Sequence, residues 1–247
     1  MQEKEYRQIY EKLESPEDVD RLVHKDYERD FLFVVYTLKV IRDTKKRYYS
    51  VKKKAPELLM DWRLGASFLE LSLELGFPPV LTASILMQQR GWSKNRFSKA
   101  VREPSIIDNQ RIKAELKEVI DADLIYSPKG NQIQFERGRE VEDRIGRWVK
   151  AKNIKHITEK EAKKRGHIKT PDFLLEAPLK VNGHWVNWIE SKASFGDRDE
   201  IKKDYRKQLT HYVDLFGAGM VCYWYGFIEG ILDDERIIVK DKEFFER

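Results

Sequence analysis

Three charged side chains in the second half of the chain have the types and the spacing that metal-assisted hydrolysis of a phosphodiester requires. They are Asp172, which follows a proline, and the nearby pair Glu190 and Lys192. Carboxylates suit Mg²⁺, which usually binds through one or two of them and keeps several waters. A bound ion lowers the pKa of a water molecule, and a lysine beside it can orient or deprotonate that water. We therefore expect Asp172 and Glu190, with the Ser191 carbonyl, to bind Mg²⁺ or Mn²⁺ and Lys192 to assist the attacking water.

A β-hairpin is the element that would bring these residues together. Asn182-Gly183 between two strand-like runs is the strongest short hairpin signal, and it places Val181 opposite His184. In that register Asp172 lies opposite position 193 and beside Lys192. We therefore expect the aspartate of one strand to meet the Glu-x-Lys sequence of its neighbour.

Two further properties of the hairpin matter for this geometry. Side chains alternate along a strand, so Glu190 and Lys192 are expected on the same face. Pro178 interrupts the first strand, and a bulge there would shift the register.

The helix expected over residues 136–152 supplies a third carboxylate. Glu142 lies three and seven residues before Ile145 and Val149 and so borders the apolar stripe of this helix. Glu140 shares a face with Arg144 and Arg147 and is expected to point outward. Glu142 is therefore the candidate to reach the metal, and an ordinary surface charge is the alternative.

The helix expected over residues 199–216 follows the Glu-x-Lys strand. Tyr205, Gln208, Tyr212 and Phe216 fall on one of its faces. From this face Gln208 could contact the lysine, the metal-bound water or a phosphate. The alternative is a polar residue at the edge of the core.

The two halves of the chain differ in their predicted secondary structure. Two helices within residues 65–101, broken at 76–79, are typical of a helix-turn-helix, although a plain helical bundle gives the same pattern. A cluster of turn residues at 127–131 suggests a boundary. Strand-like runs at 170–176, 179–192 and 219–228 then predict a mixed β-sheet flanked by helices. We therefore expect α/β architecture, with a helical, nucleic-acid-binding domain over 1–130 and an α/β domain over 131–247.

Composition and charge limit the class of protein. The chain has 247 residues, of which 41% are hydrophobic and 36% are charged, so it is too apolar for a disordered chain and too polar for a membrane protein. One cysteine, Cys222, excludes a disulfide framework and a Cys-rich zinc site. The net charge of +5 permits nucleic acid as a partner without requiring it. We expect a cytoplasmic protein, or a nuclear one in a eukaryote.

Basic residues form three clusters, and each cluster creates a positive electrostatic potential that attracts phosphates. The alternative is that the clusters are ordinary solvated helix faces. The candidate nucleic-acid-binding residues are Lys45, Lys46, Arg47, Lys52, Lys53, Lys54, Lys94, Arg96, Lys99, Lys163, Lys164 and Arg165.

Three longer strings carry a family resemblance. Residues 169–173 (KTPDF), 188–197 (WIESKASFGD) and 223–228 (YWYGFI) resemble the TPD-motif family, which includes a codanin-interacting nuclease of vertebrates. The family belongs to the PD-(D/E)XK nuclease superfamily and is similar to archaeal Holliday-junction resolvases. The resemblance implies a helical part containing a helix-turn-helix, followed by a restriction-endonuclease-like domain.

What the family does is carried over only at matching positions. The resemblance implies an Mg²⁺-dependent deoxyribonuclease with Asp172, Glu190 and Lys192 at the catalytic positions, and with Glu142 and Gln208 at further positions of its site. The implied substrate is DNA, branched or single-stranded. Resolvase-like relatives often dimerise, which implies a homodimer, and no protein partner is specified.

Two other functions remain open. The chain could be a catalytically inactive nucleic-acid-binding or scaffold protein that keeps the nuclease fold, although intact Asp172, Glu190 and Lys192 argue against it. It could also be a transposase-type end-cutting endonuclease, which shares the Thr-Pro-Asp-Phe sequence. The string at 223–227 argues against this alternative.

Overall fold

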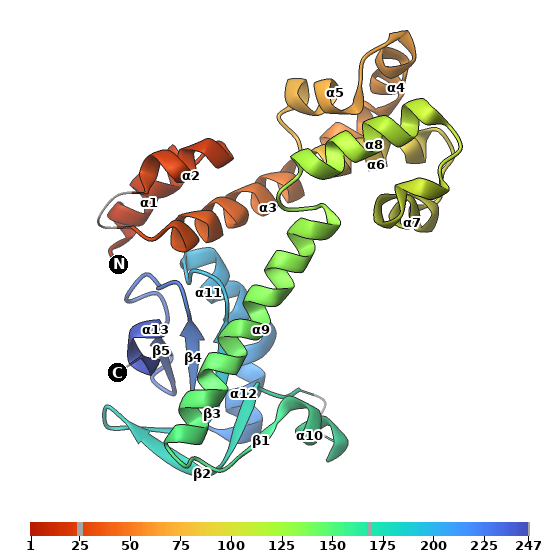
Figure 1. Cartoon of the computed structure of the whole chain (residues 1–247). Helices are drawn as coiled ribbons and strands as arrows, with labels where there is room; N and C mark the ends of the chain where they lie inside the picture. Colours follow the sequence, from red (N-terminus) through yellow and green to blue (C-terminus); the bar gives the residue numbers. More distant parts are fainter. Residues whose placement is uncertain (24–26, 167–168, 247) are drawn as a thin grey trace. The chain divides into compact units, whose positions relative to one another are not determined.

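The computed structural model describes residues 1–23, 27–166 and 169–246, apart from the side chain of Lys160, and divides into two compact units (Figure 1). The first, here called the sheet unit, consists of Met1–Leu38 and Arg137–Arg247. The second, here called the helical unit, is Lys39–Glu136. This division differs from the boundary expected at residue 130, because the first 38 residues belong with the C-terminal half.

The helical unit is built around a central apolar helix. Its helices are α4 (Ala55–Leu64), α5 (Phe68–Leu75), α6 (Pro79–Gln89), α7 (Lys94–Arg102) and α8 (Gln110–Ala122), with the later part of α3 (Arg29–Lys53) and a short 3₁₀ helix at Pro104–Ile106. Ala83, Leu86 and Met87 of α6 are fully buried, as is Leu116 of α8. The core of this unit therefore lies between α6 and the helices that surround it.

The break expected at 76–79 is present as the turn between α5 and α6. Gly76 ends α5 with a left-handed backbone, at φ 53°, which a side chain would disfavour. The two helices meet at 115°. No single helix in the described ranges is long and apolar enough to cross a membrane, and only this bent pair reaches the required length and composition together.

The sheet unit has one five-stranded mixed sheet in the order β1-β2-β3-β4-β5. The strands are β1 (His156–Thr158), β2 (Phe173–Val181), β3 (His184–Lys192), β4 (Gly219–Tyr223) and β5 (Ile237–Lys240). The first three are antiparallel, and β3, β4 and β5 are parallel to one another. The expected mixed sheet flanked by helices is thus confirmed, while β1 and β5 were not anticipated.

Helices cover both faces of this sheet. In Figure 1, α9 (Pro128–Ala151) crosses in front of the strands, and α11 (Arg198–Asp204) and α12 (Thr210–Phe216) lie behind them. On the α9 side, Val141, Ile145 and Val149 pack in one cluster with residues of β2, β3 and β4. On the other side, Trp188 of β3 packs with residues of α11 and α12. Gly219 allows this packing, because a Cβ there would lie 2.0 Å from the Trp188 indole.

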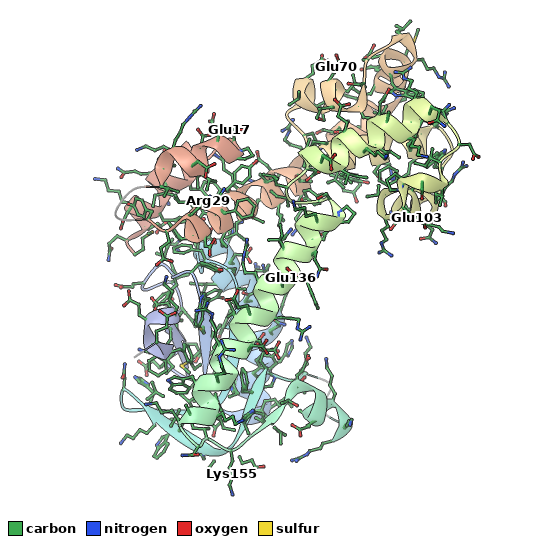
Figure 2. All side chains as sticks on the ribbon, in the orientation of Figure 1. Glu17, Arg29, Glu70, Glu103, Glu136 and Lys155 are labelled. Carbon is green, nitrogen blue, oxygen red and sulfur yellow. The ribbon has the colours of Figure 1, made fainter. Side chains whose placement is uncertain are left out.

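The turn expected at 127–131 is instead the first turn of α9. Ser127 caps the helix through a hydrogen bond from the Gly130 N–H to its hydroxyl, at 3.0 Å, and Pro128 occupies the first helical position. The same residue types that mark a turn thus begin a helix of 24 residues. It runs past Glu136 and ends before Lys155, both labelled in Figure 2.

The β2–β3 hairpin has the predicted turn but not the predicted register throughout. Val181 pairs with His184, as expected, and the pairing continues to Leu179 with Val186. A bulge then separates this part from the pairs Leu174–Trp188 and Phe173–Ile189.

Between the two paired parts, β2 advances by five residues and β3 by two. Pro178 lies in this bulge and has no N–H to give to the ladder. The prediction that Asp172 lies opposite position 193 is therefore wrong by three positions. Because Phe173 pairs with Ile189, Asp172 lies next to the Glu190–Ser191 segment.

Shorter helices complete the sheet unit. They are α1 (Glu3–Lys12), α2 (Pro16–Leu22), α10 (Glu159–Lys164) and α13 (Lys242–Phe245), together with the beginning of α3. α2 begins at Pro16 after Ser15, whose N–H donates to Asp18 at 2.8 Å. Tyr6 of α1 and Phe31 of α3 pack against Phe195, which explains why the first residues of the chain belong to this unit.

Candidate active site

Asp172 lies immediately before β2, at the sheet end where the antiparallel β3 finishes. Its Oδ2 accepts the Ser191 N–H at 2.7 Å and the Ser191 hydroxyl at 2.5 Å. These two bonds hold the carboxylate beside the Glu-x-Lys sequence. The predicted convergence of Asp172 with this sequence is therefore present, although it is reached through a different register.

Glu190 and Lys192 lie on the same face of β3, as the strand alternation predicts. Lys192 Nζ donates to Glu190 Oε1 at 2.6 Å and to Gln208 Oε1 at 2.7 Å. The structure thus brings Gln208 directly to the lysine, which is one of the three contacts expected for it. The ammonium is held between a carboxylate and an amide oxygen.

The environment of Glu190 is unfavourable for its charge. The residue is only 5% exposed, and its Oε2 is buried without a hydrogen-bond partner among the described residues. Burial and then the nearby charge of Asp172 raise the pKa of Glu190 to about 7, although Lys192 acts in the opposite direction. A buried carboxylate oxygen without a partner is costly, so this position favours a cationic or hydrogen-bonding ligand.

Lys192 keeps its charge despite its burial. Burial by itself lowers the pKa of the ammonium, but the charges of Glu190 and Asp204 outweigh it, so the pKa is raised. Asp204 is buried at the end of α11, and burial raises its pKa. Its Oδ2 accepts the Tyr223 hydroxyl at 3.1 Å. The lysine is therefore a fixed cation in a negatively charged environment.

A single π-helical turn, Tyr205–Leu209, joins α11 to α12 and carries Gln208. Such turns are rare and occur frequently at functional sites. One turn later, the Tyr212 hydroxyl donates to the Thr170 carbonyl at 2.9 Å. Burial, followed by the charges of Glu190 and Asp172, raises the pKa of Tyr212. This helix therefore contacts both the lysine and the segment that leads into Asp172.

Glu140 and Glu142 of α9 are both exposed. Glu140 accepts two hydrogen bonds from Arg144, at 3.1 and 2.7 Å, and points outward. Burial and then the charge of Asp172 raise the pKa of Glu142, so these two carboxylates are close enough to interact. Glu142 comes from the helix on the sheet face opposite α12, and its place in a metal site stays a prediction.

The donor set suits an oxygen-preferring ion such as Mg²⁺ or Mn²⁺ better than a softer metal such as Zn²⁺. No group of three or more His, Cys, Asp or Glu side chains in the described ranges is arranged to hold a metal by itself. Mg²⁺ does not need such a cage, because it binds through one or two carboxylates and keeps its waters. The pair Asp172 and Glu190, with the unpartnered Glu190 Oε2, meets that requirement.

The basic candidates fall into different roles. In the helical unit Lys45, Lys46 and Lys52 are exposed, whereas the Arg47 guanidinium donates to the carbonyls of Leu75 and Gly76 at the end of α5. Arg47 is therefore engaged in structure. The other exposed basic candidates of this unit are Lys53, Lys54, Lys94, Arg96 and Lys99, of which Arg96 stacks on Trp92 at 4.3 Å.

The basic candidates of the sheet unit lie on and directly after α10. Lys163 pairs with Glu159 at 2.6 Å, while Lys164 and Arg165 are exposed.

Three residues near the lysine did not emerge as candidates from the sequence. Asp204 lies four residues before Gln208, a helical spacing that could have marked it. Thr170, whose buried hydroxyl has no partner among the described residues, is part of the Thr-Pro-Asp sequence. The charge of Glu159 acts on both Glu142 and Tyr212, and no local pattern predicts this.

Comparison with known proteins finds a family model and several relatives that match this chain. A family model described as "Protein of unknown function TPD sequence-motif" matches residues 108–243, more than half of the chain. Relatives named CDAN1-interacting nuclease 1 are similar in sequence. The Bos taurus protein is 35% identical over 168 residues, covering 65% of this chain and 60% of the relative. The Homo sapiens protein is 32% identical over 203 residues, covering 78% and 69%. The match thus spans about 60% of the length of the bovine relative. No solved structure matches the chain.

Proposed function

The chain belongs to the TPD sequence-motif family, and from the site that its matched segment builds we propose that it is a metal-dependent nuclease of the PD-(D/E)XK type. The proposed reaction is hydrolysis of phosphodiester bonds in DNA, with branched or single-stranded structures as the substrates to test first. Relatives that carry the name nuclease are similar over 65% and 78% of this chain.

One observation carries the proposal. Lys192 Nζ is held at 2.6 Å from Glu190 and 2.7 Å from Gln208, while the second Glu190 oxygen is buried and has no partner among the described residues. Asp172 is fixed beside this pair by two hydrogen bonds from Ser191. A buried carboxylate with one satisfied and one unsatisfied oxygen, next to a second carboxylate and a cation, is suited to binding a metal and a phosphate together.

Each residue then has a defined task. Asp172 and Glu190 would hold Mg²⁺ or Mn²⁺, with Glu142 and the Ser191 carbonyl as further candidates. When bound, the ion would lower the pKa of a water molecule and stabilise negative charge on the phosphate. Lys192 would orient the attacking water and neutralise the phosphate with its fixed positive charge.

Gln208 holds the lysine in position for this task. Its amide oxygen accepts from Nζ, so the ammonium stays oriented when Glu190 engages a metal. A lysine on a flexible stem loses rotamer freedom when it is fixed in this way. We therefore expect Gln208 to contribute to the rate by orientation rather than by proton transfer.

The helical unit would bind the nucleic acid backbone. The angle of 115° between α5 and α6 lies in the range of helix-turn-helix pairs, and α7 presents Lys94, Arg96 and Lys99 on an exposed surface. Contacts of Lys and Arg with phosphates release counterions, so the proposal requires affinity for DNA that falls as salt rises.

The test uses the full chain and a panel of substrates. Single-stranded, duplex, flap, splayed and four-way DNAs, and a matched RNA, are incubated with Mg²⁺, Mn²⁺ or EDTA. We expect cleavage of at least one DNA that needs the metal and disappears in Asp172→Ala and Lys192→Ala. Glu140→Gln is the matched control, because it removes a carboxylate that points away from the site.

The outcomes separate the possible functions. Cleavage that persists in both Asp172→Ala and Lys192→Ala would contradict the site assignment. Salt-dependent DNA binding without cleavage in any metal would instead favour a binding or scaffold protein that keeps the fold.

A further inference from the structure

The segment that follows the Glu-x-Lys strand, Ser194–Asp197, has no task in the proposed reaction, yet it is enclosed by the protein. Phe195 is 1% exposed and Asp197 is 3% exposed. A buried carboxylate is costly unless it is hydrogen-bonded. The contacts of Asp197 therefore indicate what the segment does.

Asp197 joins the first helix of the chain to α11. The Tyr6 hydroxyl of α1 donates to Asp197 Oδ2 at 2.5 Å. The Glu200 N–H at the start of α11 donates to Asp197 Oδ1 at 3.0 Å, so the same carboxylate is the N-cap of α11.

The aromatic rings around this carboxylate are closely packed. The Tyr6 ring stacks on Phe195 with centroids 4.8 Å apart and 10° between the planes. Phe31 contacts Phe195 edge-on at 5.4 Å. Gly196 has no room for a side chain, because a Cβ there would lie 2.7 Å from the Tyr223 ring. The junction is therefore closely fitted on every side that these contacts describe.

Both elements that position Lys192 end at this junction. Phe195 lies three residues after Lys192, the last residue of β3, and the Lys192 carbonyl accepts the Trp224 N–H at 2.9 Å. α11, capped by Asp197, leads through the π turn to Gln208, which accepts from Lys192 Nζ. A shift at Asp197 would thus move the amide relative to the ammonium.

We infer that Tyr6 is a positioning residue for the active site: by holding Asp197, the first helix of the chain fixes the position of Gln208 relative to Lys192. The inference rests on the proposed nuclease function for its effect on turnover. Its structural part, the link from Tyr6 to α11 and Gln208, stands independently of that function.

The test compares two substitutions that remove the same atom. Tyr6→Phe keeps the stacked ring and removes the hydroxyl bound to Asp197. Tyr27→Phe is the matched control, because the Tyr27 hydroxyl donates to Glu5 at 2.9 Å within the same N-terminal segment. Both proteins are measured by amide hydrogen exchange over residues 198–216 and by steady-state cleavage of the best DNA substrate with Mg²⁺.

For Tyr6→Phe we expect faster exchange in 198–209 and a fall in kcat of about tenfold at unchanged KM, since the loss of a buried hydrogen bond commonly has an effect of about that size. Tyr27→Phe should change neither quantity. Equal behaviour of the two variants, or unchanged exchange in 198–209 for Tyr6→Phe, would overturn the inference. If the wild-type chain cleaves no substrate, the proposed function fails, and the exchange result still decides the structural link.

A second pair of variants covers the case in which Tyr6→Phe does not fold. Asp197→Asn keeps an oxygen for the Glu200 N–H and an amide group that can donate to the Tyr6 hydroxyl, whereas Asp197→Ala removes both interactions. We expect Asp197→Asn to keep kcat within about twofold of wild type and Asp197→Ala to lose activity together with protection in α11. Equal kcat values in these two variants would also overturn the inference.

Discussion

The buried pair of Glu190 and Lys192 makes a quantitative prediction about stability that is separate from catalysis. Removing one partner of a buried ion pair typically costs about 3–5 kcal/mol, because it leaves the other charge uncompensated. The Lys192 side chain is 18% exposed, and Glu190 can take up a proton, so we expect a smaller cost. Lys192→Met should lower the free energy of unfolding of the sheet unit by about 2 kcal/mol at pH 8.

Removing both charges should restore most of that stability. Replacing a buried ion pair with uncharged groups of similar volume is often neutral. The double variant Glu190→Gln, Lys192→Met is therefore expected to lie within about 1 kcal/mol of wild type. Glu190→Gln alone leaves Lys192 near Asp204 and should cost about 1 kcal/mol. The coupling energy of the cycle is then about 2–3 kcal/mol.

The assay is urea unfolding monitored by tryptophan fluorescence. Trp148, Trp188 and Trp224 belong to the sheet unit and report its unfolding transition. Cleavage is measured in parallel and should fall by about 10² to 10³ in all three variants, because each removes a group from the proposed machinery. Activity and stability should thus diverge in the double variant. Additive single effects, or a Lys192→Met protein as stable as wild type, would refute the reasoning that the pair is buried and coupled.

Three further predictions concern other parts of the molecule. Tyr212→Phe removes the hydrogen bond to the Thr170 carbonyl and should weaken Mn²⁺ binding, measured by calorimetry, several-fold. Tyr205→Phe is the control, because the Tyr205 hydroxyl bonds Asp234, and it should leave the affinity unchanged. Equal Mn²⁺ affinities of the two variants would contradict the role of Tyr212. Burial raises the pKa of Asp123, despite bonds from the N–H groups of Tyr126, Ile125 and Val80. The folded chain therefore holds this proton more tightly than the unfolded chain, so this contribution to stability falls as pH rises from about 3.9 through the raised pKa. Urea unfolding of Asp123→Asn against wild type should show that the variant lacks this slope, and parallel slopes would contradict the assignment. Changing Lys52, Lys53 and Lys54 together to Gln should reduce the slope of log affinity for DNA against log salt concentration by about 0.9 for each phosphate that the variant no longer neutralises. Arg47→Gln, which breaks bonds to α5, should lower stability instead. An unchanged slope in the lysine variant would mean that the DNA binds elsewhere.

Local sequence patterns were sufficient to predict several parts of the site. Asn182-Gly183 predicts the hairpin because both residues can adopt the positive φ that its turn requires, and both do. The two-residue alternation of a strand places Glu190 and Lys192 on one face, and the structure confirms it through their hydrogen bond. The helical repeat also predicts an outward Glu140, which bonds Arg144, whereas the assignment of Glu142 to the metal stays a prediction.

The position of Asp172 needed information that local patterns do not contain. A proline in a strand indicates a bulge, but its size depends on what packs on both faces of the sheet. Here β2 advances by five residues where β3 advances by two, which moves Asp172 from a place beside Lys192 to one beside Ser191. The residue types indicated which side chains could act together, whereas their register depended on the size of the bulge.

The sequence also could not show that the first helix of the chain belongs with the last hundred residues. An amphipathic helix such as α1 shows that one face is buried, but the pattern carries no information about its partner. The partner of Tyr6 lies 191 residues away, at Asp197. The buried string after Lys192 therefore meets a strand, a helix and the N-terminal segment at once. The contacts of Phe195 and Asp197 within the protein are with α1, α3 and α11. We therefore expect part of this long motif to be explained by the elements that it joins, which the Tyr6→Phe experiment tests.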